Sequence, residues 1–64
     1  MEKTITLRRD QEHLLGNVVV LGKKFLGQCN MVSNRDCIMI HWKFKSPEYL
    51  RLFLKKIPPA ISLN

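Results

Sequence analysis

The stretch FLGQCNMVSNRDCIMIHWKF, residues 25–44, decides the fold that this sequence predicts. In its second half, Ile, Ile, Trp and Phe occupy every second position over residues 38–44. This period of two is typical of a half-buried β-strand. Folding the first half back across a turn at residues 33–36 pairs Val32 with Cys37 and places the apolar residues of both strands on one face. The stretch therefore predicts a β-hairpin with one apolar face.

A helix is predicted directly after the hairpin, over residues 46–57. Ser46 is a favourable N-cap, and Pro47 suits the first helical position. Four apolar residues follow with the spacing i, i+3, i+4 and i+7, and two prolines then end the helix. We therefore expect an α+β fold, in which a small antiparallel sheet built on the hairpin 25–44 is packed by this C-terminal helix.

The remaining segments predict shorter elements. Residues 4–7 are expected to form a short strand, and residues 60–63 either a last edge strand or a segment that lies against the core. Residues 10–15 are expected to form a helical turn with the aspartate at its N-cap and its end at the following glycine. The apolar, β-branched run 18–21 predicts a buried strand, followed by a turn or bulge at residues 22–24.

An all-α alternative stays open. Ser33 and Asp36 also match the capping box of a helix that would run through Trp42. The chain would then hold a helix-turn-helix. The alternation over residues 38–44 favours the sheet.

The length of 64 residues predicts one small domain, residues 1–64. A chain this short buries only about 60% of its unfolded surface, so it benefits from a partner. Exposed sheet edges lead us to expect a homodimer. The core is too small to enclose a typical small-molecule pocket, and no set of side chains has the spacing of a catalytic group. We therefore expect no enzyme.

Eleven Lys and Arg residues against five Asp and Glu residues give a net charge of +6. Such a balance favours a polyanionic partner, and we expect a non-catalytic regulatory protein that binds nucleic acid, RNA or DNA. A membrane surface is disfavoured, because the sheet needs the apolar stripe of the helix. The candidate binding residues are the basic clusters and two polar residues of the hairpin: Lys43, Lys45, Arg51, Lys55, Lys56, Arg8, Arg9, Arg35, Lys23, Lys24, Gln28 and His41.

The two cysteines, Cys29 and Cys37, point to opposite faces in the predicted register, so we expect no disulfide between them. Together with the two histidines they lack the spacing of a zinc site, and we expect neither a metal nor a cofactor. Reduced thiols, with no signal peptide and no apolar run of membrane-spanning length, indicate a cytoplasmic protein.

A second function class stays open: a small protein-interaction module, for example an inhibitor or adaptor. It would dock through its sheet edge or through the basic face of the helix. Tyr49, Trp42 and Arg51 are of types favoured at protein interfaces. A strong dependence of binding on salt would favour nucleic acid over this alternative.

Overall fold

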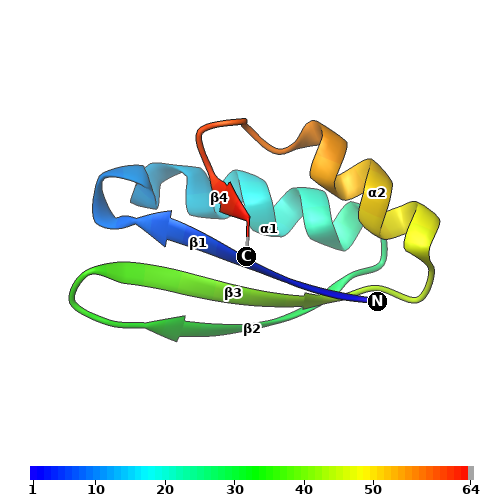
Figure 1. Cartoon of the computed structure of the whole chain (residues 1–64), viewed down its shortest axis with the longest axis horizontal. Helices are drawn as coiled ribbons and strands as arrows, with labels where there is room; N and C mark the ends of the chain where they lie inside the picture. The colour runs from blue at the N-terminus through cyan, green and yellow to red at the C-terminus, as the bar shows by residue number, and fades with distance from the viewer. Residues whose placement is uncertain (64) are drawn as a thin grey trace.

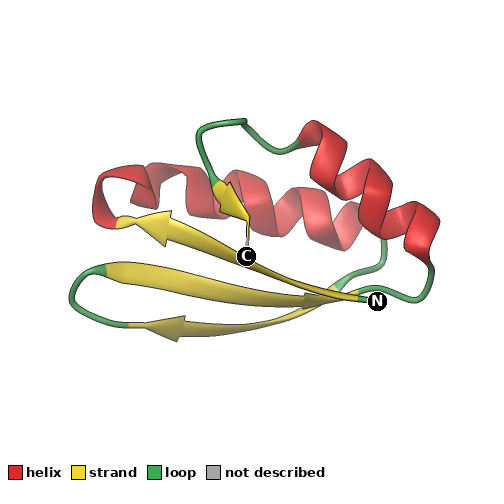
Figure 2. Ribbon diagram, in the orientation of Figure 1, coloured by secondary structure: helices red, strands yellow, loops and turns green. Residues whose placement is uncertain are grey.

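The computed structural model describes residues 1–63 and shows two layers, a four-stranded antiparallel sheet and a layer of helices on one face of it (Figure 1, Figure 2). The strands are β1 (Glu2–Arg8), β2 (Gln28–Ser33), β3 (Cys37–Lys43) and β4 (Ser62–Leu63); the helices are the 3-10 helix η1 (Arg9–Leu14), α1 (Leu15–Lys24) and α2 (Pro47–Lys56). The order across the sheet is β2-β3-β1-β4. Along the chain, the order β-α-β-β-α-β is that of the split βαβ, or ferredoxin-like, arrangement. The predicted α+β class and C-terminal helix are confirmed.

The core lies between the sheet and the two α-helices. Its buried apolar residues are Ile5, Leu7, Val18, Ile38, Ile40, Trp42, Phe44, Phe53, Ile57 and Ile61. Three aromatic rings form its centre, with the Phe53 centroid 5.1 Å from those of Trp42 and Phe44. Phe53 belongs to the predicted apolar stripe of α2, and Ser46 caps this helix as predicted, since its Oγ accepts a hydrogen bond from the N–H of Tyr49 (3.3 Å).

The prediction of a strand at residues 18–21 and a turn at 22–24 is wrong, because both segments belong to α1. Val18 and Gly22 lie one helical turn apart and are the buried residues of this helix. A Cβ at position 22 would overlap the Trp42 ring, so glycine lets the helix lie directly on the indole. Burial against the sheet thus overrides the strand preference of consecutive valines.

The predicted helical turn exists as η1, but its predicted ends are wrong. Arg8, and not Asp10, is the N-cap; its N–H donates to Oε1 of Gln11 (3.0 Å). At the other end the backbone does not leave the helical region at Gly16 but continues into α1. The glycine therefore acts as a helix residue and not as a stop.

The central hairpin is confirmed, within narrower limits and with a register shifted by two residues. Cys29 pairs with Trp42, where the sequence predicted Gly27. The turn is the cause: the N–H of Asn34 donates to the carbonyl of Cys37 (3.0 Å), and the Asn34 side chain accepts from the Cys37 N–H (2.9 Å). A shift by two keeps every side chain on its face, so the predicted sorting of faces holds.

Candidate nucleic-acid interface

The sheet has one face that the helices leave uncovered (Figure 2). It carries every second residue of the three long strands, and we call it the open face. Its residues are Glu2, Thr4, Thr6, Arg8, Gln28, Asn30, Val32, Cys37, Met39, His41 and Lys43. Most of these side chains are hydrogen-bonding groups, and none of them is Phe, Tyr or Trp.

The centre of the open face is a row of polar side chains across β1, β3 and β2. His41 lies between Thr4 on one side and Asn30 on the other. Thr4 Oγ1 and His41 Nδ1 share a hydrogen bond of 2.6 Å, which fixes the orientation of the imidazole. One step along the strands, Gln28 lies opposite Lys43. The predicted residues Gln28, His41 and Lys43 therefore share one surface.

Four lysines belong to segments that end or begin near one end of the sheet, and we call them the lysine rim: Lys43 on the open face, Lys45 just after β3, and Lys23 and Lys24 at the end of α1. Figure 1 shows that the end of α1, the end of β3 and the start of α2 lie at the same end of the molecule. All four side chains are exposed. Within the described part of the chain, none of them forms an ion pair. Their charge is therefore available to an anion.

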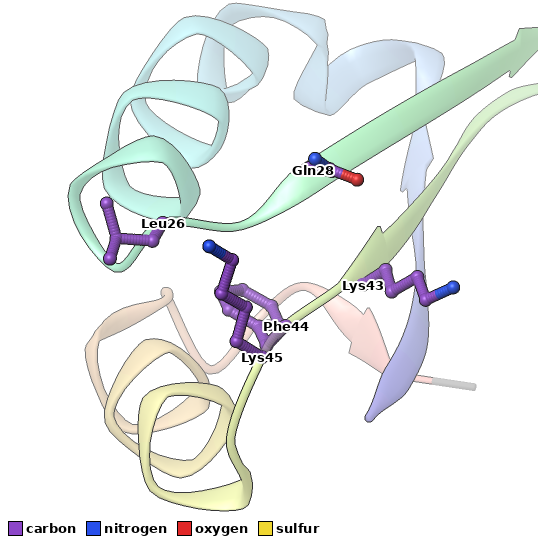
Figure 3. Close-up of a pocket in the computed structure, with 5 residues that line it drawn as sticks. All are labelled: Leu26, Gln28, Lys43, Phe44 and Lys45. Atoms are coloured by element: carbon purple, nitrogen blue, oxygen red, sulfur yellow. The ribbon is translucent and has the colours of Figure 1, made fainter.

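A shallow pocket lies inside the lysine rim (Figure 3). It is lined by Leu26, Gln28, Lys43, Phe44 and Lys45 and has a volume of about 130 Å³. The Lys45 side chain extends toward Leu26, whereas the Lys43 side chain points away from it. Small-molecule sites measure about 300–1,000 Å³, so this pocket suits a single group such as a phosphate.

The wall of the pocket contains an unusual backbone conformation at Leu26, whose φ is 62°. The N–H of Leu26 donates to the carbonyl of Lys23 (3.0 Å), and that of Gly27 to the carbonyl of Gly22 (2.9 Å). These two bonds form the Schellman motif that ends α1, in which glycine usually occupies the position of Leu26. A leucine costs about 1–2 kcal/mol there, yet its side chain is 58% exposed.

The strain at Leu26 therefore holds an apolar side chain out at the mouth of the pocket. Strained residues of this kind cluster at ligand sites. Sequence reasoning missed Leu26. Leu26 can be singled out only when the end of α1 at Lys24 is known. Position 26 is then the one that needs a positive φ to end the helix, and it holds a leucine where glycine is usual.

The predicted residues of α2 lie on the helical layer, on the other side of the sheet from the open face. Arg51, Lys55 and Lys56 are exposed there. Helix α2 begins beside the lysine rim and runs away from it, so its last residues lie at the far end of the helix (Figure 1). The structure therefore places Lys55 and Lys56 away from Lys43 and Lys45.

The remaining predicted residues, Arg8, Arg9 and Arg35, lie at the opposite end of the sheet, around the hairpin tip. Arg8 Nε donates to Asp10 (3.0 Å), and this bond lowers the pKa of the Asp10 carboxyl and raises that of the Arg8 guanidinium. Both side chains are exposed. The Arg8 charge is thus matched by a neighbouring carboxylate.

Arg9 has a structural role at this end. Its Nη2 donates to Ser33 Oγ (2.7 Å) and to the carbonyl of Asn34. Its Nη1 lies 3.5 Å from a carboxylate oxygen of Glu12. The side chain ties η1 to the hairpin tip, and both of its terminal nitrogens have partners there.

Cys29 and Cys37 are free, and their register places them on opposite faces of the sheet, as predicted. Among the described residues, no group of three or more His, Cys, Asp or Glu side chains could hold a metal ion. In the same part of the chain, no helix has both the length and the apolar character that crossing a bilayer requires. Comparison of the chain with protein-family models, with curated proteins and with solved structures found no match, so a function has to be argued from the open face and the lysine rim.

Proposed function

We propose that this chain is a non-catalytic, regulatory protein that binds single-stranded nucleic acid, RNA or DNA. The observation that carries the proposal is the polar open face, together with four exposed lysines at its end of the molecule that form no ion pair among the described residues. A net charge of +6 adds a long-range attraction for polyanions. The free thiols of Cys29 and Cys37 support a reducing, cytoplasmic setting.

A single strand fits the open face better than a duplex does. The base edges of a duplex lie in grooves that admit a helix or a two-stranded ribbon. A broad sheet face does not enter such a groove, but it can support unpaired bases that are spread over its surface. The position of the polar residues on the sheet, and not on a protruding helix, therefore favours a single strand.

Two kinds of contact follow from the geometry. The lysine rim binds phosphates, and the pocket beside Lys45 accommodates one of them. Gln28, Asn30 and His41 offer hydrogen bonds to base edges. Because the open face has no Phe, Tyr or Trp on which bases could stack, we expect the lysines to supply most of the affinity.

The test is a titration of short RNA and DNA oligonucleotides, single-stranded and duplex, at several salt concentrations. Four phosphate contacts on a single strand predict a log–log salt slope of about −3, at roughly 0.7 per contact. Single strands should bind more tightly than duplexes of the same length. Affinity equal to that of an unstructured peptide of the same charge would refute the proposal.

A matched pair of variants locates the site. Lys43→Ala/Lys45→Ala and Lys55→Ala/Lys56→Ala each remove two positive charges, the first pair from the lysine rim and the second from the end of α2. The first should reduce the salt slope by about 1.4, and the second should leave it nearly unchanged. Equal losses would show that binding follows net charge and not the open face.

The protein-interaction module stays a second candidate, because α2 exposes Tyr49 and Leu52 to solvent beside Arg51. Tyrosine and arginine are enriched at interfaces. This candidate places the partner on the helical layer, so Tyr49→Ala and Arg51→Ala should abolish binding to a protein partner. The same two changes should leave oligonucleotide binding at the open face intact.

A further inference from the structure

Strand β2 forms one edge of the sheet, and its backbone pattern shows which residues face outward. The bond from Asn34 N–H to the Cys37 carbonyl makes these two residues a hydrogen-bonded pair. Such pairs alternate along an antiparallel ladder, so residues 28, 30 and 32 bond to β3. Cys29, Met31 and Ser33 therefore direct their N–H and C=O groups away from the sheet.

This edge lacks the features that normally prevent strand pairing. β2 contains no charged residue and no proline over its six residues, in a chain that is 25% charged. Met31 and Val32 are 52% and 50% exposed, one on each side of the strand. The opposite edge, β4, has two strand residues in the part of the chain that the structure describes. β2 is therefore the edge that invites an additional strand.

We propose that a second copy of this chain pairs with β2 in antiparallel orientation, with a two-fold axis at Met31. This register pairs Met31 with its own copy and Cys29 with Ser33 of the other copy, so all three outward residues are used. An axis at Asn30 would use only two of them. Pairing also keeps each side chain on its face, because residues of equal parity meet.

A second copy of the chain fits this edge because the β2 edge carries no charge, so two copies of it can lie against one another without repulsion between the two strands. Two bodies that each carry +6 repel one another, and the repulsion is smallest where no charge lies on either strand. A two-fold axis also requires that a patch match itself, which an uncharged strand does. The product is one continuous sheet in which the two open faces lie side by side.

The contact is small, since it joins two short strands and covers Met31 and Val32. Interfaces below about 1,200 Å² are typical of weak, reversible complexes. We therefore expect a concentration-dependent dimer with a dissociation constant in the micromolar range. It forms without nucleic acid, so its test is independent of the proposed function.

The experiment measures mass by sedimentation velocity over a range of protein concentrations, with far-UV circular dichroism to verify the fold. Met31→Lys and Met31→Glu each place like charges opposite one another at the axis. Each variant alone should be monomeric, with at least about a tenfold loss of affinity. An equimolar mixture of the two should recover the dimer, because Lys and Glu then meet at the axis.

Val32→Lys is the matched control. It adds the same charge to the same strand, but in the proposed register position 32 lies opposite Asn30 of the other copy, so this variant should still dimerise. A wild-type chain that stays monomeric at several hundred micromolar would overturn the proposal. So would a Met31→Lys variant that dimerises like wild type, or a mixture that stays monomeric.

Discussion

The two ends of the sheet are both rich in positive charge, yet they differ in what surrounds that charge. At the hairpin tip, Arg8 and Arg9 have carboxylate neighbours, and Arg9 also bonds to the tip itself. In the lysine rim, Lys43 and Lys45 line a pocket, and none of the described residues forms an ion pair with any of the four lysines. Arg9 ties η1 to the hairpin tip and Arg8 is matched by Asp10, whereas the lysines of the rim have no such partner among the described residues.

This difference shows that a count of basic residues does not locate a binding site. Both ends supplied candidate binding residues, because adjacent arginines and adjacent lysines look alike in a sequence. The interactions within the folded chain distinguish the arginines from the lysines. A guanidinium has several N–H donors in a planar arrangement, so it readily binds carbonyls and carboxylates of its own chain. The following predictions test the contrast between the ends.

The largest effect is expected from Gly22→Ala, which would disturb the packing of α1, the helix that carries Lys23 and Lys24, on Trp42. The new methyl group overlaps the Trp42 ring, and neither the helix nor the buried ring can move easily. We expect a loss of about 3 kcal/mol in the free energy of unfolding, measured by urea denaturation. Gly16→Ala is the control: a Cβ there meets nothing within 4 Å, so it should stabilise the protein by about 0.5–1 kcal/mol. Equal effects at both positions would contradict the close packing of α1 on Trp42.

A smaller effect is expected from Leu26→Gly, which separates stability from binding at the rim. Relief of the left-handed backbone should raise the free energy of unfolding by about 1 kcal/mol. Loss of the exposed side chain from the pocket mouth should weaken single-strand binding by about fivefold, or about 1 kcal/mol. Thermal denaturation and fluorescence anisotropy measure the two quantities. A variant that is more stable and binds equally well would show that Leu26 takes no part in the site.

The smallest effect is expected from Asp10→Asn at the hairpin tip. The pKa of Asp10 is lower in the folded protein than in the unfolded chain, so its carboxylate stabilises the fold above its unfolded pKa. That contribution disappears as the pH falls through the folded pKa. Because both partners are exposed, the thermal midpoint should hardly change at neutral pH, and wild type and variant should converge in acid. A clear gain in oligonucleotide affinity would show that Arg8, once freed from Asp10, also binds the oligonucleotide. Ion pairing alone would then explain why the two ends of the sheet differ in binding.

The parts of the fold that the sequence predicted are those in which local and tertiary preferences agree. Ser46 and Pro47 start α2 by local chemistry, and the apolar stripe that follows is the one the core buries. In β3 the alternation of side chains and the burial pattern coincide. Segment 18–24 shows the opposite case, since its valines favour a strand, whereas burial of Val18 and Gly22 against the sheet favours the helix.

The candidate site was predicted in part for the same reason. Gln28, His41 and Lys43 share the open face because strand alternation determines which way a side chain points, even with the register displaced by two residues. Lys23 and Lys24 belong to the lysine rim only because residues 15–24 form a helix, α1, that ends at the same end of the molecule as β3. No local pattern indicates the direction in which α2 runs, and that direction carries Lys55 and Lys56 away.

The burial of Trp42 has a spectroscopic consequence. It is the single tryptophan of the chain, it is almost fully buried, and its Nε1 has no hydrogen-bond partner among the described residues. An indole in such surroundings has few polar groups that can reorient around its excited state, so its fluorescence emission should lie at short wavelength and shift to the red on unfolding. The ring touches Gly22 but does not line the pocket. One emission spectrum therefore distinguishes a disturbed core from an occupied lysine rim.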